Sequence, residues 1–382
     1  MFTVRVVTTV RGFLRDLFDY HQNQTFVYDR KQIYESKSSY VRKLSSLIKL
    51  PLFNGLGAFQ VLTCNVAENI AFSYNRFLKC NKPYVLYLEN PLAPLHYSIG
   101  RNKALLSKIR LKKIMQNRNL RYIVCLSKAC ENTLPLYYNI TENVAVEQIY
   151  PLVCRRLRIK PDDIKTKSGR KELKCLYISA SFELKGGQDI LAAFGKIENE
   201  NIKLTIITKP DSISIEDMKI ISNNSNRIAL LDFNLSKDQL GQFYSDSNIL
   251  LNPSRQDSFP LVILEAMKYG NAILSTDIYA IKEMVKQGEN GYLVRPKYEF
   301  WNQDNLPNKA VWNHRRKTIY SRYVDETVVA FLTDKIKLLD RDRDALEALS
   351  QASYMKAATP PFSEDYIYKK WKTLFKQINI QG

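Results

Sequence analysis

The chain has 382 residues, 45% of them apolar, which is enough for two or three domains with full hydrophobic cores. Its formal net charge is +19, and residues 1–150 carry +12 of it, with 21 Lys and Arg against 9 Asp and Glu. This excess suits an anionic partner, namely nucleic acid, an anionic membrane or a phosphorylated ligand, or indicates only a soluble basic protein. No apolar run reaches the ~18 residues of a membrane-spanning helix, and the start MFTVRVVTTVRGF lacks the apolar stretch of a signal peptide. We therefore expect a cytoplasmic protein whose contact with a membrane, if any, is peripheral.

In the first half, short β-branched or aromatic stretches alternate with longer stretches of helical spacing. The predicted strands are residues 2–9, 25–29, 59–64, 83–89, 121–127 and 144–151. The stretch 101–117 predicts a helix with Leu105, Ile109, Leu111 and Ile114 on one face and its basic side chains on the other. Strands alternating with helices predict βαβ units and a parallel sheet.

The same alternation restarts after a polar, charged segment. Residues 156–172 read as a linker, and further strands are predicted at 173–179, 202–208, 227–233, 247–254, 271–277 and 291–296. The predicted fold class is therefore α/β, with two halves: a domain over residues 1–155 and a second over 173–362, the latter with an apparent insertion at about 300–323.

The stretch SRQDSFPLVILEAMKYG, residues 254–270, places one carboxylate before a helix and another inside it. Pro260 suits the first turn of a helix and Gly270 its C-terminal end, so we expect a helix over about 260–269. The helix N-terminus would offer free amides and partial positive charge to a phosphate. Asp257, in the loop, can accept hydrogen bonds from a sugar, and Glu265 can accept them from a ribose. The spacing alone favours the plainer interpretation, in which Asp257 is a loop residue and Glu265 is a solvated helix residue.

Asp257-x7-Glu265, the following AMKYGNAILST, and then Glu283, Val285, Gly288 and Gly291 resemble the retaining glycosyltransferases of family 4, in glycosyltransferase group 1. The resemblance covers about 173–296 and implies the GT-B fold. That fold has two facing Rossmann-like domains with the active site in the cleft between them. It also implies that the C-terminal helix, residues 363–382, crosses back to the first domain.

The resemblance also assigns roles to particular residues. ELKGGQDILAAF, residues 183–194, resembles the family's Lys-Gly segment, so Lys185 is expected to hold the donor diphosphate, with Asp257 on the sugar. The other expected donor-binding residues are Glu265, Ser258, Phe259, Leu261, Val262, Gly12, Thr208 and Asn234. Two departures are Asp257, where the family has Glu, and Ala180, where it commonly has Arg. Arg255 is a candidate for the missing phosphate contact, or else a surface arginine.

The first domain is the acceptor side in this family. PYVLYLENPLAPLHY, residues 83–97, aligns with a strand that ends near the sugar, which makes Glu89 a catalytic candidate and His96 an acceptor-side candidate. The alternatives are a solvated strand-end acid and a structural loop histidine.

The sequence contains no GxGxxG, P-loop, HExxH or GxSxG motif, and no spacing of its six cysteines and three histidines that suggests a metal site. We expect a nucleotide sugar as substrate, no cofactor, and no metal. The expected acceptor is a glycan or lipid-linked molecule in cell-surface polysaccharide biosynthesis.

The basic face of 101–121 and the Trp-, Tyr- and Arg-rich segment 300–323 suit an anionic membrane surface. Three alternatives remain open: a non-catalytic glycosyltransferase-like partner subunit, a basic nucleic-acid-binding protein, and an epimerase or phosphorylase of the same fold.

Overall fold

The structure is a computed structural model that describes residues 2–10, 12–22, 25–28 and 52–381. The chain forms two compact units. Unit 1 comprises Met1–Val153 and Pro361–Gly382, and unit 2 comprises Cys154–Pro360.

Unit 1 is built on a six-stranded parallel sheet of order β2-β1-β4-β6-β7-β8. Its strands are β1 (Val4–Val6), β2 (Phe26–Val27), β4 (Ile70–Tyr74), β6 (Tyr84–Leu88), β7 (Leu120–Cys125) and β8 (Ala145–Gln148). A separate parallel pair consists of β3 (Val61–Cys64) and β5 (Phe77–Cys80). The described helices of four residues or more are α1 (Gly12–Phe18), α3 (Leu52–Gly55), α4 (Leu105–Met115), α5 (Lys128–Thr133) and α15 (Glu364–Gln381).

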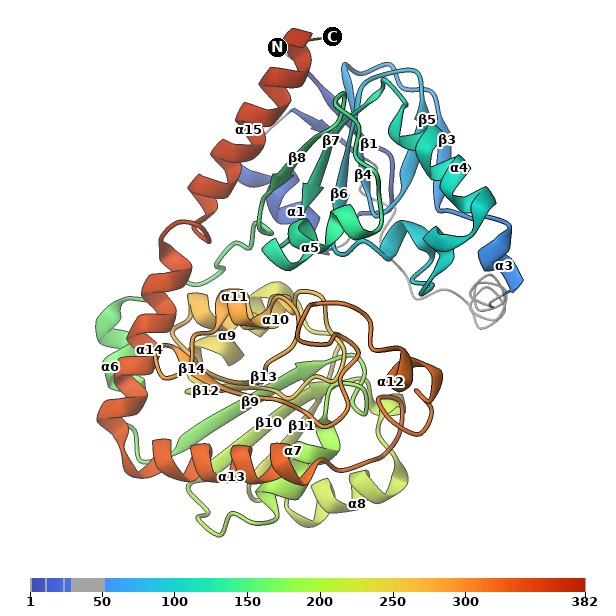
Figure 1. Ribbon diagram of the computed structural model, residues 1–382. Helices are drawn as coiled ribbons and strands as arrows, with labels where there is room; N and C mark the ends of the chain where they lie inside the picture. The colour runs from blue at the N-terminus through green and yellow to red at the C-terminus, as the bar shows by residue number, and fades with distance from the viewer. Residues whose placement is uncertain (1, 11, 23–24, 29–51, 382) are drawn as a thin grey trace. The chain divides into compact units, whose positions relative to one another are not determined.

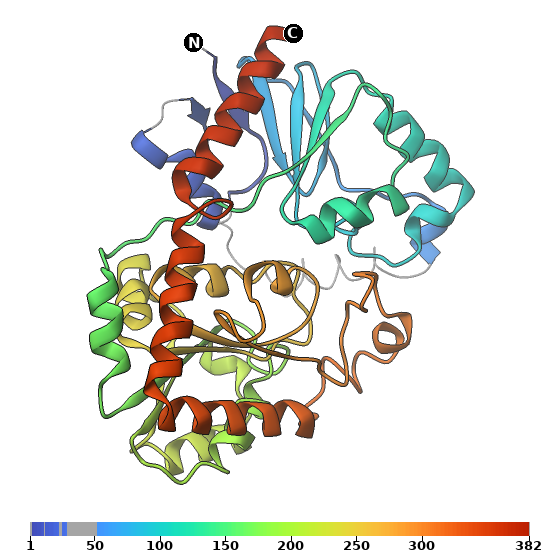
Figure 2. The same ribbon diagram turned by 60° about the vertical axis from the view of Figure 1, so that its left-hand side comes forward.

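The last helix of the chain completes the core of unit 1. Trp371 of α15 is 1% exposed and packs its ring against Phe72 of β4 and Tyr87 of β6, at centroid distances of 5.6 and 5.0 Å. Figures 1 and 2 show α15 running beside the sheet of unit 1. The C-terminal helix therefore packs against the sheet of the first unit, as the resemblance implied.

Unit 2 is a second six-stranded parallel sheet, of order β11-β10-β9-β12-β13-β14. Its strands are β9 (Leu173–Ser179), β10 (Ile202–Thr208), β11 (Ile228–Asp232), β12 (Ile249–Asn252), β13 (Ala272–Thr276) and β14 (Gly291–Val294). Its helices of four residues or more are α6 (Pro161–Ser168), α7 (Gly187–Phe194), α8 (Ile215–Asn223), α9 (Lys237–Asp246), α10 (Leu261–Lys268), α11 (Ile281–Met284), α12 (Lys309–Asn313), α13 (Glu326–Arg341) and α14 (Arg343–Ala358). Figure 1 shows α9, α10 and α11 on one face of this sheet and α7, α8 and α13 on the other.

All six predicted strands of unit 2 are present within a few residues of their expected bounds. In unit 1, β4 and β5 are additional to the prediction. They are separated only by Asn75 and Arg76, and Asn75 has the left-handed φ of 59° that a tight turn requires.

The structure differs from the linker predicted over 156–172, because α6 lies within it. Ile164 and Lys167 are buried in unit 2, and Gly270 (φ 61°) is so close that a Cβ there would lie 2.4 Å from Ile164 Cδ1. A single apolar residue and the buried stem of a lysine are enough to give this polar helix a packed face.

The amphipathic face predicted for the helix at 101–117 is wrong in part, although Leu111 is buried as expected. Leu105 and Ile109 are 74% and 57% exposed, whereas Arg101, expected on the basic face, is buried. The Arg101 guanidinium instead donates to Asn54 Oδ1 at 3.2 Å and the Ala58 carbonyl at 3.0 Å.

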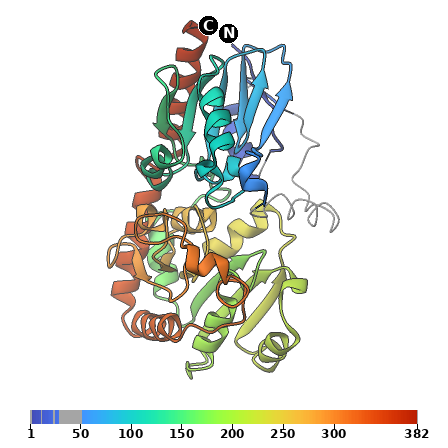
Figure 3. The ribbon, with the colours of Figure 1, turned by 45° about the vertical axis from the view of Figure 1, so that its right-hand side comes forward.

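The aromatic residues of 300–323 are also less exposed than expected. Phe300 and Trp301 are 2% and 3% exposed, and Trp301 stacks on Tyr279 with ring centroids 4.3 Å apart. Figure 3 shows α12 and the coil around it on one side of unit 2. Most of the aromatic area of this segment therefore stabilises unit 2 and does not form an exposed surface.

Candidate active site

The candidate site in unit 2 begins where β12 ends. The segment after β12 leads to α10, whose N-cap is Pro260 and whose C-cap Tyr269 precedes Gly270 in the left-handed region (φ 61°). This is the helix that Pro260 and Gly270 predicted. The first amides of a helix have no acceptor within it, so the N-terminus of α10 directs N–H groups and partial positive charge out of the carboxyl edge of the sheet.

Gly186 brings a second segment against this loop. It has φ 73° and precedes α7, and a Cβ at this position would lie 2.3 Å from the Pro253 carbonyl oxygen. Only glycine allows so close an approach of the two backbones in this conformation. The Lys-Gly pair of the sequence motif therefore has a structural cause, since the glycine places the lysine beside the loop.

Lys185 and Asp257 meet as a result. The Lys185 ammonium donates to Asp257 Oδ2 at 2.5 Å and to the Gln256 carbonyl at 2.7 Å. The two side chains are 22% and 17% exposed, so the pair is partly screened from water but open to a ligand. The structure thus joins two of the three predicted catalytic residues, which are 72 positions apart in the chain.

Glu265 is held by a tyrosine that the sequence did not single out. The Tyr244 hydroxyl of α9 donates to Glu265 Oε2 at 2.7 Å. Tyr244 is 2% exposed and its ring stacks on Tyr269, with centroids 5.7 Å apart. Burial, and then the neighbouring Glu265 carboxylate, raise the pKa of Tyr244 well above its ordinary value, so it stays a hydrogen-bond donor. No sequence pattern links these residues, because their contact depends on how α9 packs beside α10.

Arg255 is neither a surface arginine nor placed to replace the missing phosphate contact. It is 2% exposed, and its guanidinium donates to both carboxylate oxygens of Asp189, at 3.1 and 3.0 Å. It also donates to the carbonyls of Ser321 and Tyr323. Burial raises the pKa of Asp189, and the Arg255 charge opposes that shift. The pair fixes the loop before α10 to α7 and to the end of segment 300–323.

The remaining donor-side candidates of unit 2 differ in accessibility. Thr208 ends β10 and is fully buried, with its hydroxyl 3.2 Å from Ser212 Oγ, so the side chain belongs to the turn that follows. Asn234 is exposed in the loop between β11 and α9, and its backbone amide donates to Asp232 Oδ1 at 3.1 Å. The four remaining candidates all lie in the loop before α10 or in its first turn: Ser258, Phe259, Leu261 and Val262.

In unit 1, Glu89 follows β6 and receives hydrogen bonds from several side chains. The Tyr74 hydroxyl donates to Glu89 Oε2 at 2.6 Å, and the Tyr97 hydroxyl donates to Oε1 at 2.5 Å. The Asn90 side chain also donates to Oε1, at 3.4 Å. Glu89 is thus an oriented, partly buried carboxylate and not a solvated strand-end acid.

The other two candidates of unit 1 lie in loops. His96 and Tyr97 both have left-handed φ values, 55° and 57°, which is uncommon for two successive residues that are not glycine. This conformation turns Tyr97 back to Glu89. Gly12 is the first residue of α1, and a Cβ there would meet no atom within 4 Å, so the position leaves open space at the helix start.

The residues of this candidate site lie in a segment that matches a known protein family. The family model of glycosyl transferases group 1 matches residues 160–303, a segment that contains Lys185, Asp257 and Glu265. The predicted resemblance to the group 1 glycosyltransferases is confirmed. Assignment of this group 1 segment to retaining family 4 stays a prediction.

The individual curated proteins that match this chain share only low sequence identity with it. N-acetyl-alpha-D-glucosaminyl L-malate synthase of Bacillus anthracis is 24% identical over 205 residues, which cover 50% of this chain and 53% of that enzyme. The chain spans about half or less of the length of the curated relatives it matches.

Solved structures match over the whole chain. Anabaena HepE, solved in complex with UDP and glucose, has a TM-score of 0.64 at 13% identity, covering 99% of this chain and 100% of that one. WaaG, described as a glycosyltransferase involved in lipopolysaccharide biosynthesis, has a TM-score of 0.58 at 13% identity, covering 97% and 99%. The predicted GT-B fold is confirmed, and the cleft expected between its two domains stays a prediction.

The described part of the chain contains neither a helix suited to span a membrane nor a metal-binding cluster. In residues 2–10, 12–22, 25–28 and 52–381, no helix has the length and apolar character needed to cross a bilayer. In the same ranges, no three or more His, Cys, Asp or Glu side chains are grouped so that they could hold a metal ion.

Proposed function

We propose that the protein is a retaining glycosyltransferase that moves a sugar from a nucleoside-diphosphate sugar to a glycan or lipid-linked acceptor. The observation that carries the proposal is the Lys185–Asp257 pair, with Lys185 Nζ and Asp257 Oδ2 2.5 Å apart in the loop before α10. A cation, a carboxylate and a helix N-terminus at the carboxyl edge of a parallel sheet form a site for a phosphate joined to a sugar. Eight residues after Asp257, Glu265 accepts a hydrogen bond from Tyr244, which supports its proposed role in binding ribose hydroxyls.

In the proposed mechanism, binding of the donor replaces the contact between Lys185 and Asp257. The diphosphate replaces Asp257 as the counter-charge of Lys185, and Asp257 then accepts a hydrogen bond from a hydroxyl of the transferred sugar. The bond between the anomeric carbon and the β-phosphate oxygen breaks, and its electron pair stays on the phosphate. The acceptor hydroxyl oxygen forms the new bond on the same face, and its proton passes to the released phosphate oxygen. Lys185 and the α10 amides stabilise the negative charge that develops on the diphosphate.

This reaction consumes the nucleotide sugar as a substrate and uses no cofactor. The charge of the leaving group is met by Lys185 and the α10 amides, so the proposal also assigns no role to a metal. In unit 1, Glu89 is proposed to orient a sugar or acceptor hydroxyl, because two tyrosine hydroxyls and an asparagine amide fix its carboxylate. Gly12 and His96 are proposed to line the donor and acceptor sides of that region.

The acceptor is proposed to be presented at the cytoplasmic face of an anionic membrane, during synthesis of a cell-surface polysaccharide. An exposed patch of unit 1 supports this: Leu105, Leu106 and Ile109 of α4 are 74%, 52% and 57% exposed. Lys108, Lys112 and Lys113 are exposed on the same helix. Apolar side chains flanked by lysines are typical of helices that lie in the headgroup region of anionic bilayers.

Ligand-induced stabilisation, combined with a turnover assay, tests the central proposal. UDP, GDP, dTDP and their common sugar conjugates are each added to wild type, Glu265→Ala and the exposed control Glu198→Ala, and the melting temperature is measured. We expect one nucleotide to raise the melting temperature of wild type and of Glu198→Ala but not of Glu265→Ala. Slow release of free sugar from the matching conjugate, lost in Lys185→Ala, is the expected activity.

The same panel separates the alternatives. A partner subunit binds the nucleotide but releases no sugar from any conjugate with any acceptor fraction, a result favoured by the Asp257 and Ala180 departures. A nucleic-acid-binding protein is unaffected by every nucleotide and binds DNA or RNA with an affinity that falls steeply with salt. An epimerase converts the sugar nucleotide without an acceptor, and a phosphorylase cleaves a glycan with inorganic phosphate to release a sugar 1-phosphate.

A further inference from the structure

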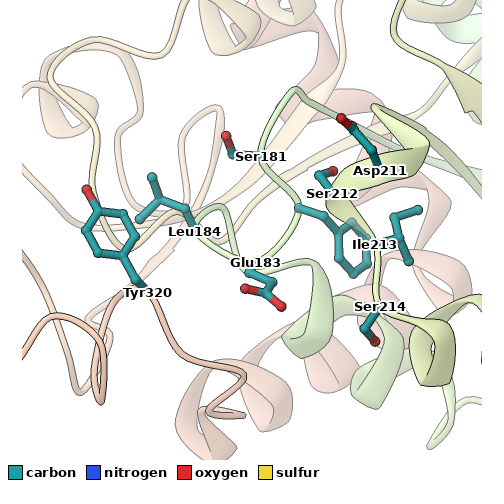
Figure 4. Close-up of a pocket in the computed structure, with 9 residues that line it drawn as sticks. Ser181, Glu183, Leu184, Asp211, Ser212, Ile213, Ser214 and Tyr320 are labelled. Carbon is teal, nitrogen blue, oxygen red and sulfur yellow. The ribbon is translucent and has the colours of Figure 1, made fainter. Parts of the chain in front are cut away.

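A cavity of about 460 Å³ lies on unit 2 beside the Lys185–Asp257 pair. We call it the Tyr320 pocket. It is lined by Ser181, Phe182, Glu183, Leu184, Asp211, Ser212, Ile213, Ser214 and Tyr320. Figure 4 shows Tyr320 on one side, the residues from Asp211 to Ser214 on the other, and Glu183 between them. Its volume is in the range of about 300–1,000 Å³ found for small-molecule sites.

The pocket shares backbone with the candidate active site. The Lys185 amide donates to the Ser181 carbonyl at 3.2 Å and so closes the turn that forms the pocket floor. On the Tyr320 side of the pocket, the Tyr320 hydroxyl donates to Gln256 Oε1 at 3.2 Å. Gln256 immediately precedes Asp257. A ligand in the pocket therefore lies next to the residues proposed to hold the donor.

The polar groups of the lining are mainly acceptors and hydroxyls. Within the described part of the chain, the carboxylates of Glu183 and Asp211 take part in no ion pair or hydrogen bond. Ser212 and Ser214 are engaged, since Ser212 Oγ donates to the Lys209 carbonyl at 2.7 Å and Ser214 caps α8. Two carboxylates therefore remain available to accept hydrogen bonds from a ligand.

The apolar part of the lining complements these acceptors. Tyr320 is 42% exposed, so its ring is accessible to a ligand. Leu184 and Ile213 are half-buried beside the carboxylates. An aromatic ring and aliphatic side chains pack against the C–H faces of a sugar ring, while carboxylates accept from its hydroxyls. No Lys or Arg belongs to the described lining, so an anionic ligand such as phosphate is disfavoured there.

We propose that the Tyr320 pocket binds a neutral sugar residue of the acceptor glycan, next to the residues proposed to hold the donor. The proposal rests on the proposed function, because it supplies the saccharide substrate of that reaction with a second site. It also gives the 300–323 segment a role, since Tyr320 comes from it. The acidic lining selects neutral sugars over uronic acids and phosphorylated sugars.

Binding of defined saccharides to the full-length protein tests the proposal. The probes are an array of neutral oligosaccharides of glucose, galactose, mannose and N-acetylglucosamine, with glucuronate-containing oligosaccharides and spermidine for comparison. We expect at least one neutral oligosaccharide to bind wild type, and glucuronate analogues to bind at least tenfold more weakly. Tyr320→Ala and the pair Glu183→Gln/Asp211→Asn should each weaken binding about tenfold, which corresponds to the loss of one stacking contact or hydrogen bond.

Matched variants show whether the pocket itself is responsible. Tyr320→Phe keeps the ring and should retain saccharide binding, and Glu198→Gln should be unchanged because Glu198 is exposed outside the pocket. Glu265→Ala should lose nucleotide-induced stabilisation and keep saccharide binding. Failure of every neutral oligosaccharide to bind, equal binding by the pocket variants, or binding of spermidine alone overturns the inference. Nucleotide-induced stabilisation of the same preparation shows whether the proposed function stands independently of that result.

Discussion

Replacing Arg255 by methionine tests how much the buried ion pair contributes to unit 2. The Arg255 and Asp189 side chains are 2% and 1% exposed, and Asp189 also receives the Asp325 amide at 2.8 Å. In Arg255→Met, Asp189 is left as an unpaired buried acid, and the carbonyls of Ser321 and Tyr323 lose their donor. Removing one partner of a buried pair costs about 3–5 kcal/mol. For a unit of this size, that lowers the melting temperature by roughly 10 °C.

The assay is urea unfolding followed by tryptophan fluorescence and circular dichroism. Trp301 and Trp312 lie in the segment that Arg255 anchors, so their emission reports directly on its release. The double variant Asp189→Leu/Arg255→Met removes both charges and should recover at least half of the lost stability, because no buried charge remains unpaired. Lys196→Met, which breaks an exposed pair with Glu326, is the control and should change stability by less than about 1 kcal/mol. A loss below about 1 kcal/mol in Arg255→Met, or a double variant no better than the single one, would refute the reasoning.

Three further predictions concern other parts of unit 2. Lys167 donates to three oxygens at 2.6–2.8 Å, but burial lowers its pKa from 10.5 to about 7. Between these values the unfolded chain binds more protons than the folded one, so wild type should gain about 2 kcal/mol relative to Lys167→Met from pH 7 to 8.5, measured by urea unfolding. Gly186→Ala, with φ 73° and a Cβ 2.3 Å from the Pro253 carbonyl oxygen, should lose about 2 kcal/mol or more of stability and most nucleotide affinity. Tyr244→Phe removes the hydrogen bond to Glu265 and should lower the free energy of unfolding by about 1–3 kcal/mol, with weaker nucleotide binding in a thermal-shift titration.

Two of these changes have a matched control. Lys165→Met alters an exposed lysine of the same helix and should show no extra pH dependence above pH 7. Gly195→Ala adds a Cβ whose nearest neighbour lies at 3.5 Å, so stability should stay within about 0.5 kcal/mol. A flat pH profile for the Lys167 comparison, or wild-type stability in Gly186→Ala, contradicts the corresponding prediction. Unchanged nucleotide binding in Tyr244→Phe would show that Glu265 needs no positioning.

The strands of unit 2 could be predicted because each is a short apolar run between turn residues, and such runs are typical of buried parallel strands. The loop and helix around Asp257 could be predicted for a similar local reason, since Pro260 and Gly270 mark its two ends. Burial was predicted less well. Arg101 and Arg255 are charged residues that became internal, and exposed Leu105 is the reverse case. A sequence pattern assigns polarity to a residue but not the neighbours that can satisfy or cover it.

The partners of the site residues could not be predicted either. Tyr244 lies 21 residues before Glu265, and Arg255 lies 66 residues after Asp189. These separations carry no helical or strand period, so only the packed structure reveals the pairs. Family resemblance placed Lys185 and Asp257 in one donor site, but their direct contact and its physical cause, the left-handed Gly186 against Pro253, became visible only in the structure.

The discontinuity of unit 1 has a consequence for synthesis on the ribosome. Unit 2 is one continuous stretch, Cys154–Pro360, whereas unit 1 requires the final segment from Pro361 onward. Trp371, which is 1% exposed, is translated only after all of unit 2. During translation, the N-terminal domain of a protein usually folds before the later ones. In this protein the order is reversed, because the second unit can close its core while the first still exposes the surface that α15 covers. A nascent chain paused shortly before residue 361 should therefore depend on chaperones at its N-terminal half.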